Sequence, residues 1–208
     1  MNRIQSNGGK IKNVLTPLNK EDILYRGKIF EIVKQYWKLN GANKTEITER
    51  EIARRSPGVR VILNNNDKIL MIKEYRTEYE GWDYRLPGGK VFDTLEEYTK
   101  VLNEDILRYA TEAAKKELLE ETGLIANDIK YLCETKAGAT VIWDLYYFEV
   151  NNFETSITGQ NLENGEIINI DWKNIQQVKQ MCLDGIIKED RTIGVLLKYL
   201  ISKEMRTD

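Results

Sequence analysis

Residues 116–124 read Lys-Glu-Leu-Leu-Glu-Glu-Thr-Gly-Leu, a glutamate-rich segment that ends with a Gly-Leu pair. In a helix, positions three and four apart are neighbours, so Glu117, Glu120 and Glu121 share one face. Like charges at this spacing destabilise an isolated helix by roughly 0.2–0.5 kcal/mol per pair. Within the segment only Lys116, beside Glu120, can offset part of the charge. The sequence therefore predicts a helix whose acidic face either binds a cation or is simply solvated.

Two glycines precede this helix and one ends it. Gly88 and Gly89 allow the backbone to approach a bound ligand closely, and Gly123 stands where a left-handed cap is favoured. Mg²⁺ prefers carboxylate oxygens and keeps several waters, which leaves a coordination position for a substrate phosphate. This combination favours a Mg²⁺ site, with Mn²⁺ as an alternative ion, over a purely solvated acidic surface.

With these residues in place, the chain resembles the Nudix hydrolases, whose signature is G-x5-E-x7-R-E-U-x-E-E-x-G-U with U an aliphatic residue. Residues 117–124 match its second half. Lys116 replaces the arginine of the signature and lies 27 positions after Gly89 instead of 14, so thirteen residues are inserted. Arg108 stands where the signature has glutamate, and we expect Glu112, one turn before Lys116, to hold that lysine instead.

Flanking segments extend the resemblance to the branch that contains the ADP-ribose pyrophosphatases. The matching segments are Tyr25–Phe30, Ser56–Val61, Tyr75–Arg76, Tyr84–Gly89, Gly185–Ile187 and Asp190–Thr192. The resemblance implies an α+β Nudix fold, in which a mixed β-sheet lies between helices. It also implies a small N-terminal β domain over residues 1–57, which takes part in a homodimer interface, and a Nudix hydrolase domain over residues 58–208.

The resemblance implies metal-dependent cleavage of the pyrophosphate in a nucleoside diphosphate linked to another moiety, with ADP-ribose or another nucleotide sugar as the substrate. The implied catalytic metal ligands are Glu117, Glu120 and Glu121 together with the Gly88 carbonyl. The implied general base is a glutamate in the loop Thr158–Glu166, where Glu163 and Glu166 are the two candidates.

Substrate contacts are expected from two arginines, two aromatic residues and a glycine. Arg76 and Arg85 are expected to bind phosphate oxygens through the two parallel N–H donors of the guanidinium group. The alternative is that they pair with carboxylates of the chain. Trp82 and Tyr84 stack on a nucleobase, or pack within a sheet. Gly89 leaves room for the substrate beside the backbone.

Two other functions remain compatible with the sequence. The changes at Lys116 and Arg108 fit a domain that binds a nucleotide without cleaving it, as a sensor or regulator. An acidic helix that is ordinary surface fits a dimeric scaffold. A magnesium requirement separates the leading function from the scaffold, and product formation separates it from the sensor.

Composition narrows the chemistry and the partners. The 208 residues contain no histidine, which excludes Ser-His and Cys-His catalysis and His-ligated zinc. The net charge of -2 gives no basic surplus for a nucleic-acid track, and neither a signal peptide nor a segment able to cross a bilayer is recognisable. Cys133 and Cys182 lie in apolar segments and are expected to fill the core. We therefore expect a cytoplasmic protein that acts on a small molecule, without nucleic-acid or membrane partners.

The periodicity of the apolar residues predicts the order of the elements. Strands are expected at Gly27–Leu39, Glu46–Arg55, Val59–Leu63, Lys68–Tyr75, Ala139–Val150 and Ile167–Trp172, with turns at Asn40–Asn43 and Asn64–Asp67. Helices are expected at Asn174–Leu183 and Thr192–Glu204. Thr94 begins a capping box for an added helix that places Leu95, Tyr98, Leu102 and Ile106 on one face and leads into the acidic helix. Tyr36 and Trp37 either belong to the dimer interface or pack within the chain.

Overall fold

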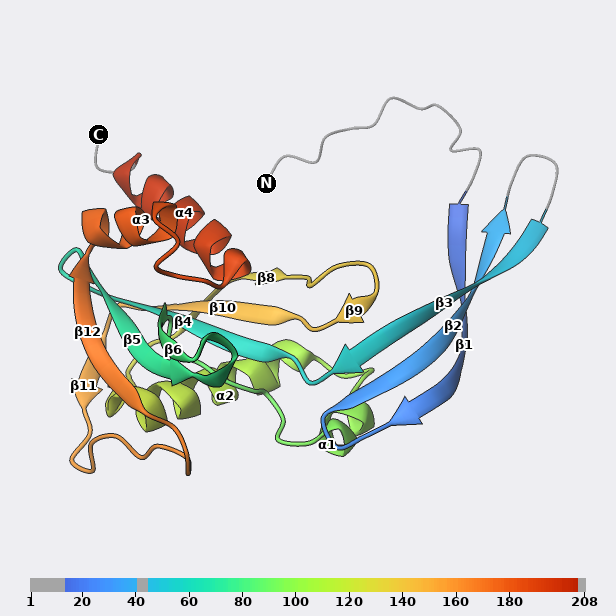
Figure 1. The fold of residues 1–208 in the computed structure, drawn as a ribbon, viewed down its shortest axis with the longest axis horizontal. Coiled ribbons are helices and arrows are strands. Elements are labelled where there is room, and N and C mark those ends of the chain that lie inside the picture. The colour runs from blue at the N-terminus through green and yellow to red at the C-terminus, as the bar shows by residue number, and fades with distance from the viewer. Residues whose placement is uncertain (1–13, 41–44, 206–208) are drawn as a thin grey trace. The chain divides into compact units, whose positions relative to one another are not determined.

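The computed structural model describes residues 14–40 and 45–205, and the chain forms two compact units (Figure 1). One unit contains the described residues up to Arg55 together with Ala137–Ile142. The other contains Ser56–Lys136 and the described residues from Trp143 onward. The N-terminal unit therefore includes Ala137–Ile142 from the second half of the chain, a segment that the expected N-terminal domain, residues 1–57, does not contain.

Four strands form the sheet of the N-terminal unit, in the order β1-β2-β3-β9. They are β1 (Val14–Arg26), β2 (Phe30–Asn40), β3 (Thr45–Arg55) and β9 (Val141–Ile142). β1, β2 and β3 pair antiparallel, and β9 lies parallel to β3. β3 confirms the strand predicted at Glu46–Arg55. β2 begins at Phe30 rather than at Gly27, because Gly27 donates its N–H to the Phe30 carbonyl in a turn.

β1 has no counterpart among the predicted strands. Its pairing with β2 is irregular between Pro17 and Glu21, where Asn19 has a φ of 51°. Such irregularities interrupt the alternation of apolar and polar residues by which a strand is recognised. The turn predicted at 40–43 lies outside the described residues except for Asn40, which ends β2.

A mixed sheet forms the centre of the second unit, in the order β12-β5-β4-β10-β8 with β6 beside β5. Its strands are β4 (Gly58–Asn65), β5 (Lys68–Arg76), β6 (Gly81–Arg85), β8 (Lys130–Thr135), β10 (Leu145–Val150) and β12 (Ile168–Asn174). β10 is parallel to β4 and antiparallel to β8. Two short strands, β7 (Leu124–Ala126) and β11 (Phe153–Thr155), pair separately. β4, β5 and β12 confirm three of the predicted strands.

Helices cover both faces of this sheet (Figure 1). α2 (Ile106–Thr122) packs on one face, where Leu118 belongs to the same buried cluster as Val61. α3 (Ile175–Leu183) and α4 (Asp190–Glu204) pack on the other face, where Leu196 shares a buried cluster with Ile62. Val61 and Ile62 are adjacent on β4 and point to opposite faces. The predicted α+β fold, with a mixed sheet between helices, is confirmed.

The inserted segment forms a short helix, α1 (Leu95–Lys100), which confirms the predicted added helix, although Leu102 lies beyond its end and Ile106 belongs to α2. The capping box itself is confirmed, because Glu97 donates its N–H to Thr94 Oγ1 at 3.2 Å and its side chain accepts from the Thr94 N–H. After α1 the chain turns, and Asp105 begins α2 by accepting a hydrogen bond from the Leu107 N–H at 3.1 Å. The apolar residues from Leu95 to Ile106 thus keep helical spacing in the sequence, although the helix is interrupted between Lys100 and Ile106.

The strand predicted at Ala139–Val150 is two strands. β9 pairs with β3 in the N-terminal unit, whereas β10 pairs with β4 and β8 in the mixed sheet. All six residues of β10 are buried, which confirms the predicted central position for this half. Side-chain alternation continues through the segment while its hydrogen-bond partners change, so periodicity alone does not reveal the division.

Several local predictions are confirmed. Asn66 and Asp67 have φ values of 47° and 63° in the turn between β4 and β5. α3 and α4 lie where helices were expected, and Asn174 caps α3. Cys182 is buried in the core, and the partly buried Cys133 packs against the same core cluster. Within residues 14–40 and 45–205, no helix is long and apolar enough to cross a membrane.

Gly123 ends α2 in the expected left-handed conformation, with a φ of 69°. A Cβ placed on Gly123 would lie 2.8 Å from the carbonyl carbon of Gly159. Gly185 has nearly the same φ, 68°, but among the described residues nothing lies within 4 Å of the position its Cβ would take. A substitution at Gly185 therefore tests backbone strain alone, whereas the same substitution at Gly123 adds crowding by neighbouring atoms.

We expect Gly185→Ala to lower the free energy of unfolding by about 1–2 kcal/mol, because a β-carbon strains a left-handed residue. Gly123→Ala should lower it by about 1–3 kcal/mol more, because the new methyl group also crowds the Gly159 backbone. Urea denaturation of both variants measures the difference. An equal loss of unfolding free energy in the two variants would contradict the close packing of the Gly159 backbone against Gly123 at the end of α2.

Candidate active site

Glu117, Glu120 and Glu121 of α2 lie within and beside the face of the helix that packs on the sheet. Ala114, Leu118 and Glu121 are all buried, because these positions follow one another along the same helix face. Glu121 keeps only 6% of its accessible surface. Glu117 and Glu120 are partly exposed. The acidic cluster therefore extends from the core to the surface.

Glu121 is a buried carboxylate with a backbone donor. Its Oε2 accepts a hydrogen bond from the Gly88 N–H at 2.7 Å. Burial raises the pKa of Glu121 well above its usual range and the charge of Glu117 raises it further, while the Gly88 N–H and Arg60 act in the opposite direction. The ionised form of Glu121 is therefore disfavoured unless a further cation is present.

Glu117 lies against the backbone of Gly89. A Cβ on Gly89 would stand 2.3 Å from Glu117 Oε1, so a larger residue would displace this carboxylate. Burial, together with the charges of Glu120, Glu166 and Glu163, raises the pKa of Glu117 from 4.5 to about 7, although Lys116 lowers it in part. The two loop glutamates therefore lie within electrostatic reach of the α2 cluster.

The backbone of Pro87–Gly89 is held against β4. The Val59 N–H donates to the Gly89 carbonyl and the Val61 N–H donates to the Pro87 carbonyl, both at 2.9 Å. Gly88 has a φ of 143°, and a Cβ on it would lie 2.1 Å from the Val59 carbonyl oxygen. Only glycine permits this approach. The glycine turn thus has a fixed place beside the carboxylates.

The loop between β11 and β12 is fastened to the C-terminal end of α2. The Asn161 N–H donates to the Glu120 carbonyl at 2.9 Å, and Gln160 Nε2 donates to the Glu121 carbonyl at 2.6 Å. These carbonyls lie in the last turn, where a helix leaves its acceptors without partners. The loop therefore caps the helix that carries the acidic cluster.

Glu163 and Glu166, the two predicted base candidates, stand further along this loop. Glu166 Oε2 accepts a hydrogen bond from the Glu163 N–H at 2.9 Å, so its carboxylate stabilises the loop. The Glu163 carboxylate makes no hydrogen bond or ion pair with the described part of the chain. The structure thus brings both residues toward Glu117 and distinguishes between them.

Comparison with known proteins identifies the family. The sequence profile described as NUDIX domain matches residues 54–191, which is more than half of the chain. The chain belongs to the Nudix family. The family assignment made from the signature is therefore confirmed, and the chain is a Nudix hydrolase.

Two known proteins are similar to this Nudix hydrolase. A GDP-mannose pyrophosphatase of Enterobacter sp. (strain 638) is 26% identical over 157 residues, which cover 73% of this chain and 77% of the relative. A crystal structure of an ADP compounds hydrolase matches with a TM-score of 0.63 at 18% sequence identity, over 93% of this chain and 95% of that chain. This second likeness supports the fold.

The contact that replaces the Glu-to-Arg pair of the Nudix signature differs from our expectation. Lys116 Nζ lies 3.4 Å from Glu120 Oε2, which confirms that this lysine offsets part of the acidic charge. Glu112 pairs with Lys115 at 2.9 Å. The predicted pair of Glu112 with Lys116 is therefore wrong, because a second lysine three residues after Glu112 takes its carboxylate.

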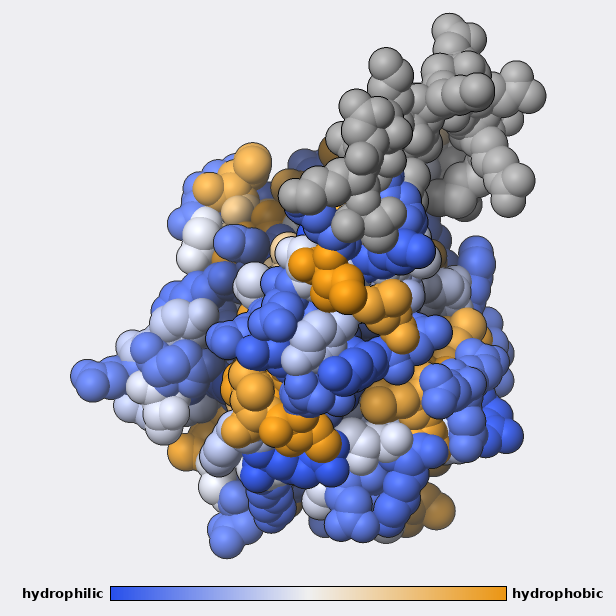
Figure 2. All heavy atoms as spheres, turned by 90° about the vertical axis from the view of Figure 1, so that its right-hand side faces the viewer, coloured by the Kyte–Doolittle hydropathy of each residue, from blue (hydrophilic) through white to orange (hydrophobic). Residues whose placement is uncertain are grey.

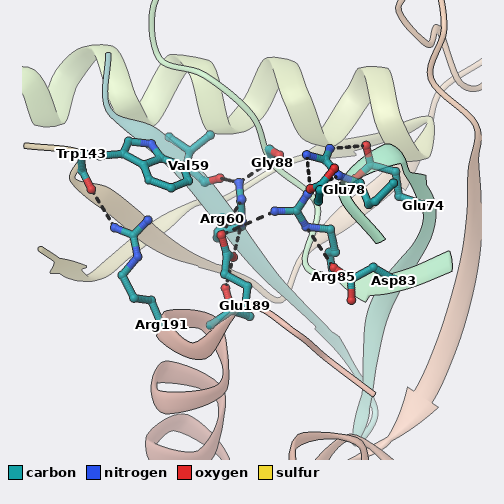
Figure 3. A network of polar contacts seen from close by, with 12 residues as sticks. Val59, Arg60, Glu74, Glu78, Asp83, Arg85, Gly88, Trp143, Glu189 and Arg191 are labelled. Atoms are coloured by element: carbon teal, nitrogen blue, oxygen red, sulfur yellow. Dashed lines mark hydrogen bonds and ion pairs between the residues drawn. The ribbon is translucent and has the colours of Figure 1, made fainter. Parts of the chain in front are cut away.

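Both arginines expected to bind substrate pair with carboxylates of their own unit, and Figure 3 shows Arg85 with Glu74 and Glu189. Arg76 lies 2.8 Å from Glu74 and 2.9 Å from Glu78. Arg85 Nη1 lies 3.3 Å from Glu74, and Arg85 Nη2 lies 3.5 Å from Glu189. Glu74 therefore pairs with both guanidinium groups.

Trp82 and Tyr84 lie on β6. The Trp82 ring meets Tyr75 edge to face with the centroids 5.8 Å apart, yet Trp82 keeps 42% of its accessible surface. The Tyr84 hydroxyl donates to Asp171 at 3.1 Å. Trp82 thus keeps an exposed surface, whereas Tyr84 is part of the sheet packing.

Two residues at this site, Arg60 and Glu189, were not predicted from the sequence (Figure 3). Arg60 Nε and Nη2 each donate to the Glu189 carboxylate at 2.9 Å. Burial raises the pKa of Glu189, but the charge and hydrogen bonds of Arg60 lower it overall to about 2. The one sequence signal is an arginine inside the apolar run from Val59 to Leu63.

The donors of the acidic face suit a divalent cation, although the side chains do not form a closed site. In the part of the chain that the structure describes, no three His, Cys, Asp or Glu side chains are arranged to hold a metal ion. The donors are nevertheless all oxygen, which Mg²⁺ prefers, and burial raises the pKa of Glu117 and of Glu121. Together with Glu120 and the Gly88 carbonyl, they are the residues that would hold it.

The metal-free protein should lose stability as pH rises, because Glu117 binds its proton more tightly in the folded chain. Between pH 4.5 and about 7 the folded chain keeps a proton that the unfolded chain has released. The free energy of unfolding therefore falls through this range and stays low above it. Glu117→Gln should melt above wild type at about pH 8 in a chelator and lose this advantage at about pH 4.

Thermal melting with and without Mg²⁺ measures this dependence. Mg²⁺ should raise the Tm of wild type at the higher pH more than that of Glu117→Gln. The exposed Glu112 on the same helix supplies the control variant, Glu112→Gln, which should melt as wild type does. A Glu117→Gln variant that melts below wild type in the chelator at high pH would contradict the burial penalty.

Proposed function

We propose that this Nudix hydrolase cleaves the pyrophosphate of a nucleoside diphosphate linked to a second moiety, in a reaction that requires Mg²⁺ or Mn²⁺. The observation that carries the proposal is the carboxylate pair Glu117 and Glu121 beside the backbone of Gly88 and Gly89. Burial raises the pKa of both carboxyl groups. Such a pair favours a cation, and a cation that keeps open positions brings phosphate oxygens with it.

The chain's own residues divide the chemistry among them. A bound divalent cation would offset the charge of the phosphates and lower the pKa of a bound water. α2 supplies the ligands. The expected room for substrate at Gly89 is taken by the Glu117 carboxylate, so the glycine turn positions the ligands, with Gly88 holding Glu121 through its N–H. We assign the general base to Glu163, because the Glu166 carboxylate already accepts a hydrogen bond within the loop. The attacking water would pass its proton to Glu163, and two phosphate-bearing products would form.

The substrate class is supported by the names of the similar proteins. One is called a GDP-mannose pyrophosphatase and the other an ADP compounds hydrolase. ADP-ribose and GDP-mannose are therefore the first substrates to test. Trp82 is our candidate for stacking on the base, and Arg76 and Arg85 are our candidates for binding phosphate. A cytoplasmic location remains a prediction from the sequence.

A second candidate function is a domain that binds a nucleotide without cleaving it. Lys116 pairs with Glu120, which is one of the expected metal ligands. Arg108 pairs with Glu104 at 3.8 Å instead of supplying the glutamate of the signature. Calorimetric binding of ADP-ribose, with no AMP or ribose phosphate formed in Mg²⁺, would favour this second function.

Glu121→Gln should lower kcat by about 100-fold, because the amide keeps the shape but removes a charge that holds the cation. Chromatography of AMP and ribose phosphate released from ADP-ribose, in Mg²⁺ and in a chelator, measures the rate. Glu112→Gln on the same helix is the matched control and should keep the wild-type rate. A folded Glu121→Gln variant that hydrolyses ADP-ribose at the wild-type rate would contradict the proposal.

The same assay tests the general base. Glu163→Gln should lower kcat by about 100-fold or more, since a general base contributes a factor of this size. Glu166→Gln should have the smaller effect, because its carboxylate supports the loop. The opposite order would assign the base to Glu166.

We also propose that the N-terminal unit forms a homodimer. Large apolar side chains of this unit are exposed, namely Leu18, Ile23, Leu24, Tyr25, Ile29, Phe30 and Ile47. Figure 2 shows hydrophobic patches among the hydrophilic residues of one molecular face. Gathered apolar surface is typical of an interface. Tyr36 and Trp37 instead contact their own unit, through Asp22 and through Arg50 over the Trp37 ring.

Sedimentation equilibrium should show a dimer for wild type and a monomer for the variant Ile23→Lys/Ile47→Lys. Two buried ammonium groups would oppose association, because a charge removed from water without a partner is costly. Ile157→Lys is the control, because Ile157 is fully exposed in the other unit. A wild-type chain that sediments as a monomer would contradict the proposal.

A further inference from the structure

Arg60 is a charged side chain in the interior of β4 (Figure 3). Its neighbours Val59 and Val61 are fully buried, and Arg60 itself is 5% exposed. Because side chains alternate along a strand, Arg60 points to the same face as Ile62, which α3 and α4 cover. A buried guanidinium is costly unless its donors are paired with good geometry. The partners of Arg60 therefore indicate its role.

Glu189 holds Arg60 in one orientation. Two parallel hydrogen bonds of 2.9 Å join the guanidinium to the Glu189 carboxylate. Glu189 immediately precedes α4, and it also accepts a hydrogen bond from the Thr192 hydroxyl in the first turn of that helix. Two bonds to one carboxylate fix the plane of the guanidinium. The start of α4 thus determines where the remaining Arg60 nitrogen points.

That nitrogen, Nη1, reaches the glycine turn. It donates to the Val59 carbonyl at 2.8 Å and to the Gly88 carbonyl at 3.1 Å. On the other side of the same α-carbon, the Gly88 N–H donates to Glu121 at 2.7 Å. The N–H and the carbonyl of Gly88 belong to successive peptide planes that meet at this α-carbon, so the contact from Arg60 fixes one of the two planes. Continuous contacts lead from Glu189 through Arg60 and Gly88 to Glu121.

We propose that Arg60 and Glu189 form a positioning pair, which orients Gly88 so that its N–H holds Glu121 and its carbonyl keeps one direction. This inference rests on the proposed function, in which Glu121 is a metal ligand. Both residues act through Gly88. The pair also couples the docking of α4 on one face of the sheet to the geometry of the carboxylates on α2, which packs on the other face.

Two conservative variants test the pair. Arg60→Lys keeps the charge, but a single ammonium cannot bind Glu189 through two bonds and also reach Gly88. Glu189→Gln keeps the size and removes the charge. We expect each variant to bind Mn²⁺ about 10-fold more weakly and to lower kcat about 10- to 100-fold, as residues that orient metal ligands do. The KM of Arg60→Lys should stay near the wild-type value, and the double variant should bind Mn²⁺ no more weakly than the single ones.

Glu149→Gln is the matched control. Glu149 lies on β10, is 6% exposed, and accepts a hydrogen bond from the Tyr199 hydroxyl of α4 at 2.8 Å. Lys203 Nζ of α4 lies 2.9 Å from the same carboxylate oxygen. This variant weakens a buried polar contact between the sheet and α4, as Glu189→Gln does, but at a place that does not touch Gly88. Its Tm should fall, while Mn²⁺ binding and kcat stay at the wild-type values.

Electron paramagnetic resonance of free Mn²⁺ measures ion binding without any turnover, and ADP-ribose hydrolysis gives kcat and KM. Wild-type Mn²⁺ affinity in both Arg60→Lys and Glu189→Gln would overturn the proposal, even if their Tm falls. Equal weakening in Glu149→Gln would also overturn it, because the effect would then belong to α4 packing in general. A wild-type chain that binds Mn²⁺ but releases no product contradicts the proposed function and leaves the pair to be judged by ion binding.

Discussion

The burial of two carboxylates beside a glycine backbone is the constraint on which the site depends. Glu121 lies on the same helix face as Leu118, so the packing that fixes α2 on the sheet also removes this carboxylate from water. The Gly88 N–H compensates only part of that loss, and burial still raises the pKa of Glu121. The packing of α2 on the sheet therefore offsets the cost of burying Glu121, and the buried carboxylate favours a positive charge beside it.

The glycine turn has a fixed position because it is part of the sheet's own hydrogen bonding. Pro87 and Gly89 accept hydrogen bonds from β4, which lies between β5 and β10 in the mixed sheet. Gly88 adds an approach to the Val59 carbonyl that no β-carbon would allow. The carboxylates on α2 thus face a rigid surface, which is the arrangement that precise metal and phosphate binding would require.

Sequence alone predicted the parts of the site that local geometry determines. The spacing of Glu117 and Glu121 and the cap at Gly123 need only a helix and its end, and the structure has both. Arg60 and Glu189 are 129 positions apart, so their pairing depends on the tertiary fold. The division between β9 and β10 was missed for the same reason, since alternation does not reveal a change of partner strands.

The loop that carries Glu163 is bonded to the helix that carries the other acidic groups. Swinging this loop away would break the bonds from Asn161 and Gln160 to α2, each worth about 0.5–1.5 kcal/mol, and would uncover the helix carbonyls. These bonds favour the position in which the loop covers the C-terminal end of α2.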